Sequence, residues 1–427
     1  MPTHGLRRRF IYHIETAERP TDHPDNPNRP VTAPNHNMQH RLDHVRILMY
    51  SHDSFGLGHL RRCRKIAHAL VDRFKGLTVL VLSGSPIIGS FDFKARVDFV
   101  RIPGVIKLYN GEYTPLSLHV DLSQTLAIRE SIIRNTAQAF DPHIMLIDKE
   151  PMGLHAEAEP TLRMLKQRGT LNILGLRDVM DEPNQLRQEW RKKDLMPRVN
   201  ELFDEIWVYG PASFGNPLEG LPLNEQLNDR MHYTGFLRDT GDGFTPSDWE
   251  RPQTPYLLVT AGGGGDGAKL MDNVLRAYES GAELMRAEML YGPFMSAEAK
   301  AALNARIDRL DGKIAARAFE PHIEPLMHFA SGVVAMGGYN TFCEILSHDK
   351  PALIAPRTRP RQEQQVRAAI AASQGILNVI DLDNPDLDTL IRTLQTLPQQ
   401  PPPSDAGIND LMTGLDRMAE RVLHHLG

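Results

Sequence analysis

The stretch from residue 333 to residue 368 contains residue types and spacings that favour nucleotide chemistry. A Gly337-Gly338 turn separates a short apolar segment from a helix that we expect to begin at Asn340 and Thr341. Glycine lets backbone amides approach a ligand closely, and the first N–H groups of a helix attract anions. The sequence therefore predicts a phosphate site at this turn.

Three polar side chains near the same turn suit a nucleotide sugar. Glu344 lies one turn into the expected helix, where its carboxylate can accept two hydrogen bonds from a ribose diol. Gln364 and Gln365 follow the next apolar segment, and their amides can both donate to and accept from sugar hydroxyls. A capping box from Thr341 to Glu344 is the alternative, in which the glutamate only satisfies amides of its own helix; taken alone, this tetrapeptide favours the cap.

The whole string GGYNTFCEIL, with the later block PRTRPRQEQ, resembles the donor-binding signature of nucleotide-sugar glycosyltransferases of the two-Rossmann-domain (GT-B) type. It is most similar to the family 28 group that contains the peptidoglycan lipid-intermediate N-acetylglucosaminyltransferase. The resemblance covers most of residues 45–425. It is specific in these two blocks and moderate at the glycine-rich loops.

A second glycine-rich turn, Gly262-Gly263-Gly264-Gly265, follows an expected strand at 256–259. The spacing is formally that of a nicotinamide-binding loop, which needs an acid at the end of the following strand. That strand, at 288–293, ends without one. We therefore assign these glycines to contact with the diphosphate of the donor, with a merely flexible turn as the alternative.

A third loop, Gly56-Leu57-Gly58-His59, follows the first expected strand. Arg61 stands where a dinucleotide loop needs its third glycine, which disfavours a nicotinamide or flavin cofactor. The loop resembles the G-x-G-H loop of the glycosyltransferase group, whose histidine faces the cleft. The resemblance implies that His59 is the general base, since an imidazole with a pKa of ~6.5 accepts protons near neutrality. A histidine that only packs or caps at the helix start is the alternative.

Other cleft positions follow from the strand ends and from the resemblance. Ligand residues of a parallel sheet lie just past the strand C-termini, which places Asp148, Arg177 and Asp178 near the cleft with Gly56 and Gly58. For the neighbouring Lys149 and Glu150 an ordinary salt-linked loop is favoured. In similar transferases the backbone at the position of Phe319 meets the base, while core packing is compatible with the same position.

Continuous apolar runs alternate with helical segments along the chain, as in parallel sheets covered on both faces. Together with the resemblance, this predicts an α/β protein of two doubly wound, Rossmann-like domains facing a cleft. The expected parts of the chain are a disordered extension at 1–44, an acceptor domain at 45–237, a linker at 238–255, a nucleotide-sugar domain at 256–404, and a terminal helix within 405–427, at 409–425, that crosses back to the first domain.

Composition limits the remaining classes. With 427 residues, two domains are the default, and a net charge of -5 argues against a nucleic-acid partner. Two cysteines exclude a disulfide framework and suit the cytoplasm. No apolar run reaches the ~18 residues that span a bilayer, so any membrane contact would be peripheral, at the inner face. Asp381-Leu382-Asp383 resembles a metal-binding D-x-D of another fold, and we expect neither a metal nor a cofactor.

These features predict a hexosyl-type glycosyltransferase that moves a sugar from an NDP-sugar, with UDP favoured, to an acceptor hydroxyl of unknown identity. Inversion at the anomeric carbon is implied by the resemblance. An epimerase or hydrolase of the same fold is one alternative, and a non-catalytic nucleotide-sugar-binding protein is another.

Overall fold

The computed structural model of the chain describes residues 40–52, 57–108, 112–239, 252–359, 361–381, 383 and 386–427. The predicted extension at 1–44 lies outside them except for its last residues. There the structure contains a short strand, β1 (His40–Arg41), paired with β3 (Phe74–Lys75). Leu42 is buried, so ordered packing begins before Val45.

The N-terminal half, residues 40–239, contains a seven-stranded parallel sheet in the spatial order β11-β10-β9-β8-β2-β4-β5. β2, the strand of this sheet that comes first in the sequence, therefore lies between β4 and β8, and the direction of winding reverses there. In such sheets the ligand crevice opens at the strand C-termini at this reversal. The strands are β2 (Arg46–Ser51), β4 (Thr78–Ser83), β5 (Val97–Arg101), β8 (Ile144–Asp148), β9 (Leu171–Arg177), β10 (Glu205–Tyr209) and β11 (Met231–Tyr233).

Both faces of this sheet are covered, as the continuous apolar runs predict. Ile47 and Met49 of β2 belong to one buried cluster with residues of α1 and α13, whereas Leu48 and Tyr50 belong to another with α2 to α5. Successive strand residues point to opposite faces, so an uninterrupted apolar run supplies both clusters. The elements are α1 (Gly58–Arg73), α2 (Leu122–Phe140), α3 (Glu159–Gln167), α4 (Pro183–Lys192), α5 (Leu195–Leu202), α6 (Glu225–Asp229), α13 (Gly414–Leu426) and the hairpin β6 (Val105–Lys107) with β7 (Tyr113–Pro115).

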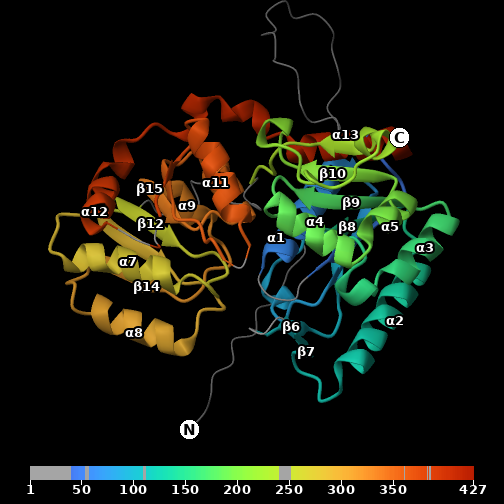
Figure 1. Cartoon of the computed structure of the whole chain (residues 1–427), viewed down its shortest axis with the longest axis horizontal. Coiled ribbons are helices and arrows are strands. Elements are labelled where there is room, and N and C mark those ends of the chain that lie inside the picture. The colour runs from blue at the N-terminus through green and yellow to red at the C-terminus, as the bar shows by residue number, and fades with distance from the viewer. Residues whose placement is uncertain are drawn as a thin grey trace, which may run out of the picture. The chain divides into compact units, whose positions relative to one another are not determined.

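The C-terminal half, yellow to red in Figure 1, repeats this plan with six parallel strands in the order β14-β13-β12-β15-β16-β17. Here the winding reverses between β12 and β15. The strands are β12 (Tyr256–Thr260), β13 (Arg286–Leu290), β14 (Ile314–Arg317), β15 (Gly332–Ala335), β16 (Ala352–Ile354) and β17 (Asn378–Val379). The helices are α7 (Ala268–Glu279), α8 (Ala297–Ile307), α9 (Glu324–Phe329), α10 (Tyr339–Ser347), α11 (Glu363–Ser373) and α12 (Leu387–Thr396).

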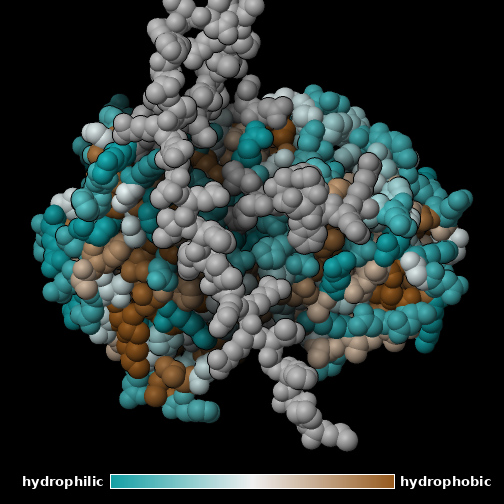
Figure 2. Space-filling view, turned by 180° about the vertical axis from the view of Figure 1, so that it is seen from behind, coloured by the Kyte–Doolittle hydropathy of each residue, from teal (hydrophilic) through white to brown (hydrophobic). Residues whose placement is uncertain are grey.

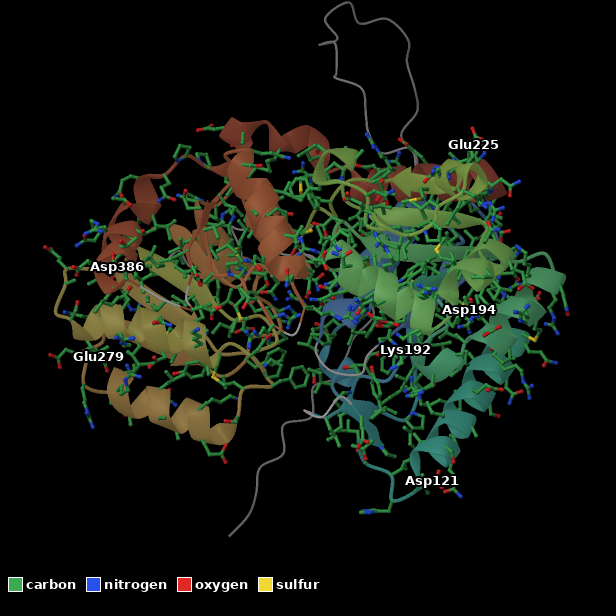
Figure 3. All side chains as sticks on the ribbon, viewed as in Figure 1. Asp121, Lys192, Asp194, Glu225, Glu279 and Asp386 are labelled. Carbon is green, nitrogen blue, oxygen red and sulfur yellow. The ribbon has the colours of Figure 1, made fainter. Side chains whose placement is uncertain are left out.

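Local capping fixes where several of these helices begin. Asp121 accepts a hydrogen bond from the Gln124 amide at 2.7 Å and so starts α2. Asp386 does the same at the start of α12, through the Thr389 amide at 3.2 Å. Both carboxylates are labelled in Figure 3 at their helix ends. An N-cap of this kind is worth about 1 kcal/mol.

The final helix begins later than its predicted start at residue 409. A 3-10 turn occupies Ile408–Leu411, and α13 runs from Gly414 to Leu426. The reason is tertiary: Phe236 donates to the Leu411 carbonyl at 2.7 Å, and Gly414 donates to the Phe236 carbonyl at 3.0 Å. The chain thus pairs with the N-terminal half before it can enter the helix, which then packs on α1.

The two halves share buried apolar contacts. Phe342 of α10 lies with its ring centroid 5.3 Å from Phe236 and 6.1 Å from Phe214, both of the N-terminal half. All three belong to one buried cluster that continues into both sheets. Residues 39–427 accordingly form one compact unit.

The surface of the N-terminal half exposes a group of apolar side chains near β7 and the start of α2. Figure 2 shows apolar residues gathered at the lower left of that view. Among the described residues, no helix has both the length and the apolar character that crossing a bilayer requires. The exposed apolar residues are Leu108, Leu116, Leu118, Val120 and Ile128.

Replacing Phe342 with alanine should destabilise the whole unit in a single transition, because its ring joins both halves. A fully buried Phe→Ala change costs about 3–5 kcal/mol. Urea unfolding followed by circular dichroism measures this. Leu118→Ala, at a side chain that is 44% exposed, serves as control and should change the unfolding free energy by less than ~0.5 kcal/mol. Two separate transitions in Phe342→Ala would show that the shared cluster does not couple the halves.

Candidate functional site

The winding reversal of the N-terminal sheet brings together residues from two neighbouring strands. β2 ends at Ser51, which lies opposite Asp148, the last residue of β8. The helix that follows β2, α1, begins at Gly58 and carries His59 and Arg62 on its first turn. Asp148 and the start of α1 therefore meet at the edge of the sheet where ligands bind.

Asp148 holds two of these side chains at once. Its Oδ2 lies 2.5 Å from Nδ1 of His59, and its Oδ1 accepts from Nε of Arg62 at 2.8 Å. Arg62 Nη2 also donates to Oδ2. Asp148 and Arg62 are buried, whereas the His59 side chain remains 17% exposed. Only the histidine of this group keeps access to a ligand.

Burial decides the charge of the histidine. It lowers the pKa of His59 to about 4, although the Asp148 carboxylate acts in the opposite direction. Burial would raise the pKa of Asp148, but Arg62 and His59 hold it well below its usual range. Near pH 7 the group therefore contains a carboxylate and a neutral imidazole. The Asp148 carboxylate can only accept a hydrogen bond, so Nδ1 of the neutral ring carries the proton. Nε2 is then free to accept a proton, as a general base must.

The winding reversal of the C-terminal sheet lies between two glycine-rich turns. Gly262 and Gly264, after β12, and Gly337, after β15, have φ values of 63°, 87° and 79°, a left-handed backbone that favours glycine. A Cβ at Gly262 would lie 3.6 Å from Thr341 Oγ1 of α10, and one at Gly338 would lie 3.9 Å from Gln364 Nε2. Three segments predicted to bind the donor are therefore neighbours.

The start of α10 has no side-chain cap. Gly338 is its N-cap residue, and the first helical hydrogen bond runs from the Phe342 amide to the Gly338 carbonyl. The capping box considered for Thr341 and Glu344 is therefore wrong. No side chain caps the first turn of α10, and the phosphate site at the Gly337-Gly338 turn stays a prediction.

Glu344 instead faces the other half of the molecule. Its Oε1 forms an ion pair with Arg61 of α1 at 2.7 Å, and the side chain is only 1% exposed. Its Oε2 is buried without a hydrogen-bond partner. A ribose hydroxyl could donate to this second oxygen, but the close cation is Arg61, which the sequence analysis treated only as a missing glycine.

Two further contacts join predicted donor and acceptor residues across the halves. Asn340 Nδ2 donates to the Gly58 carbonyl at 3.0 Å. Asp178 forms a buried, two-bond ion pair with Arg367 of α11, at 2.6 and 2.7 Å. The edges of the two sheets that carry the predicted ligand residues are therefore in direct contact.

The remaining predicted ligand residues do not all lie where the two halves meet. Gln364 is buried and accepts from the Arg357 amide at 3.1 Å, whereas Gln365 and Gly265 are exposed and do not join the group. Phe319 is half-buried and packs with Phe294 against an apolar cluster of the N-terminal half. Gly56 lies outside the described residues.

Charged neighbours complete the edge of the N-terminal sheet. Glu150 pairs with Lys193 at 3.3 Å, so the expectation of a salt-linked loop is confirmed for it. Lys149 and Arg177 have no such close carboxylate among the described residues. Within the described part of the chain, no group of three or more His, Cys, Asp or Glu side chains is arranged to hold a metal ion.

Sequence reasoning missed Arg61, Arg62 and Arg367. The run Arg61-Arg62-Cys63-Arg64 contained a signal for Arg62, since it lies three residues after His59 and hence on the same helix face. Arg367 gave none, because its partner Asp178 is far away in the sequence. The Arg62 guanidinium also lies 5.5 Å from the ring centroid of Tyr339, which belongs to α10.

Comparisons with known proteins agree with this architecture. Residues 259–409 match the family model described as the glycosyltransferase family 28 C-terminal domain. A search of curated proteins gave no match. The glycotransferase of kitacinnamycin superposes with a TM-score of 0.62 and 17% identity, over 90% of this chain and 99% of that chain.

Two other solved structures have similar folds. MurG of Acinetobacter baumannii gives a TM-score of 0.55 at 12% identity, covering 89% of this chain and 99% of that chain. UGT2 of Phytolacca americana, solved with UDP-2-fluoroglucose and pterostilbene, gives 0.57 at 15%, covering 89% and 95%. The chain therefore has the GT-B fold, in a form similar to family 28, as the sequence predicts.

The depressed pKa of His59 predicts acid sensitivity. An unfolded histidine binds a proton below pH ~6.5, while folded His59 stays neutral until about pH 4, so protonation favours the unfolded state between these values. Lowering the pH from 7 to 5 should remove about 2 kcal/mol of stability through this group. Urea unfolding at both pH values measures it.

His59→Gln should remove this part of the pH dependence, whereas His424→Gln, at an exposed position near the C-terminus, should leave it unchanged. An unaltered pH dependence in His59→Gln would show that the histidine is not buried neutral.

Proposed function

We propose that this protein is a glycosyltransferase that moves a sugar from a UDP-sugar to an acceptor hydroxyl, with inversion at the anomeric carbon. The observation that carries the proposal is the contact between the two sheet edges at which the direction of winding reverses. The uncapped start of α10 lies beside the glycine turn after β12, and Asn340 of α10 reaches Gly58, the neighbour of His59. An anion site and a base thus lie on facing halves.

The donor is assigned to the C-terminal half. The backbone amide of Gly263 and those at the start of α10 would hold its diphosphate, with no side-chain cap competing at Gly338. The unpartnered Oε2 of Glu344 supports a ribose hydroxyl there, because an unsatisfied buried acceptor costs about 1–3 kcal/mol. UDP is favoured because similar structures such as UGT2 contain it.

The acceptor is assigned to the N-terminal half. His59 Nε2 would take the proton of the acceptor hydroxyl as its oxygen attacks the anomeric carbon. The bond from that carbon to the diphosphate breaks, and the backbone amides stabilise the departing charge. A base and a leaving group held by opposite halves favour attack from the face opposite the diphosphate, which inverts the anomeric configuration.

The ion pairs of the cleft argue against an epimerase or hydrolase. Such enzymes of this fold need several acids available to the sugar. Asp148 is occupied by Arg62 and His59, and Asp178 by Arg367, so neither is free to transfer protons. As part of the proposal, the enzyme is cytoplasmic, with the exposed group from Leu108 to Ile128 as its surface for peripheral membrane contact.

A panel of UDP-, dTDP- and GDP-sugars without acceptor should stabilise the protein without being consumed. Ligand at about 100 times its Kd adds ~2.7 kcal/mol to the unfolding free energy. One nucleotide class should therefore raise the Tm by several degrees Celsius in a thermal-shift assay. Chromatography of the same mixtures should show intact donor. Free sugar or an epimer would contradict the transferase.

Replacing the base should separate chemistry from binding. His59→Ala should lower turnover about 10²–10⁴-fold, because general-base catalysis contributes that much, while nucleotide affinity stays within about threefold. His424→Ala is the control at an exposed histidine and should leave both unchanged. Full turnover in His59→Ala would exclude this base. A protein that binds nucleotide sugars but transfers to no acceptor would instead be a non-catalytic binding protein.

A further inference from the structure

Two cations lie side by side at the C-terminal ends of β8 and β9. Lys149 directly follows β8, and its amide donates to the Gly175 carbonyl of β9 at 2.8 Å. Arg177 is the last residue of β9, and its side chain is only 13% exposed. Both therefore stand at the ligand edge of the N-terminal sheet.

The other cations of this edge have close acids. Arg62 pairs with Asp148, and Arg367 pairs with Asp178. Arg361 pairs with Asp181 at 3.2 Å and with Glu189 at 2.9 Å. No acid within 4.0 Å is found for Lys149 among the described residues, and Arg177 has only Glu363 at 3.9 Å.

Glu363 neutralises the charge of Arg177 only weakly, because Glu363 already pairs with a closer cation. Arg357 Nη2 lies 2.6 Å from its Oε1, the same oxygen that faces Arg177 at 3.9 Å. Nε and Nη2 of Arg177 are buried and have no acceptor. Burial lowers the pKa of Arg177 to about 10, and burial together with Arg177 and Arg361 lowers the pKa of Lys149 to about 7.

The backbone of Lys149 supports a role for its side chain. Its φ of 72° lies in the left-handed region, where a non-glycine residue costs of order 1–3 kcal/mol. Backbone strain of this kind clusters at ligand sites. A glycine would adopt the same turn without strain, so the strain here comes from having a lysine at this position. A lysine at this point places a cation at the strand end.

The two cations are separate from the proposed diphosphate site. Arg357 forms ion pairs with Asp266, at the end of the second glycine-rich turn, and with Glu363. Glu363 in turn lies 3.9 Å from Arg177. A donor whose diphosphate lies on the glycines would therefore meet Lys149 and Arg177 only beyond Glu363. That is where the transferred sugar or the acceptor would lie.

We infer that Lys149 and Arg177 form a subsite for an anionic group, a carboxylate or a phosphate, carried either by the transferred sugar or by the acceptor. The unpaired Nε and Nη2 of Arg177 match the two oxygens of such a group, and Lys149 adds a point charge. This inference rests on the proposed function for the location of the diphosphate. It adds that the substrate is acidic, for example a uronic acid or a sugar phosphate.

Isothermal titration calorimetry with free sugars tests the subsite without any nucleotide. Glucuronate or glucose 6-phosphate should bind at least tenfold more tightly than glucose. Lys149→Gln and Arg177→Gln should abolish this preference, while Arg134→Gln, at an exposed position of α2, should retain it. Circular dichroism confirms that each variant is folded. Equal binding of neutral and acidic sugars, or a preference that survives in both variants, would overturn the inference.

A second arm locates the group. A tenfold preference for UDP-glucuronate over UDP-glucose, lost in Arg177→Gln, would place the anion on the donor sugar. Equal affinity for both donors, with glucose 6-phosphate still binding in the presence of UDP, would place it on the acceptor. If the affinity for UDP itself falls tenfold in the variants, the pair holds the diphosphate and the inference is wrong. If no nucleotide binds, the proposed function fails, and the free-sugar measurements still decide the subsite.

Discussion

The carboxylate of Asp148 fixes the positions of two side chains that define the site. It binds the guanidinium of Arg62 through two oxygens and the imidazole of His59 through one. Buried in this way, it stays ionised and sets which nitrogen of the imidazole carries the proton. Arg62 also lies over the ring of Tyr339 of α10, so the same carboxylate connects His59, the proposed base, to the helix that would hold the leaving group. Removing Asp148 would leave a buried arginine without its partner, which is strongly destabilising.

Polar contacts join the two halves at the candidate site. Arg61 with Glu344, Asn340 with Gly58, and Arg367 with Asp178 each join the half assigned to the acceptor to the half assigned to the donor. Apolar contacts also join the halves, since the ring of Phe342 packs against Phe214 and Phe236. A donor that takes the second oxygen of Glu344 would leave the Arg61 pair intact. A donor that needs both oxygens would have to displace Arg61, and the halves would then part at that point.

Local signals in the sequence predict most elements, while tertiary contacts decide the site. α2 begins at Leu122 because Asp121 caps it, and β8 forms from a continuous apolar run at Ile144–Asp148; both are local signals in the sequence. The doubly wound class follows from such runs. The strand order does not, and it is this order that places Asp148 beside β2. Thr341 and Glu344 fit a capping box locally, but a glycine already caps the helix and Arg61 takes the glutamate. The late start of α13 also has a tertiary cause, since Leu411 and Gly414 form backbone hydrogen bonds with Phe236.

A crystal structure of the protein with bound UDP tests the central claim most directly. The account predicts diphosphate oxygens about 2.7–3.2 Å from the backbone N–H groups of Gly263 and of the first turn of α10, with a ribose hydroxyl donating to Glu344. The diphosphate should lie across Glu363 from Lys149 and Arg177. A nucleotide bound elsewhere, for example in the pocket lined by Met180 and Phe214, or a ribose that does not touch Glu344, would contradict the account.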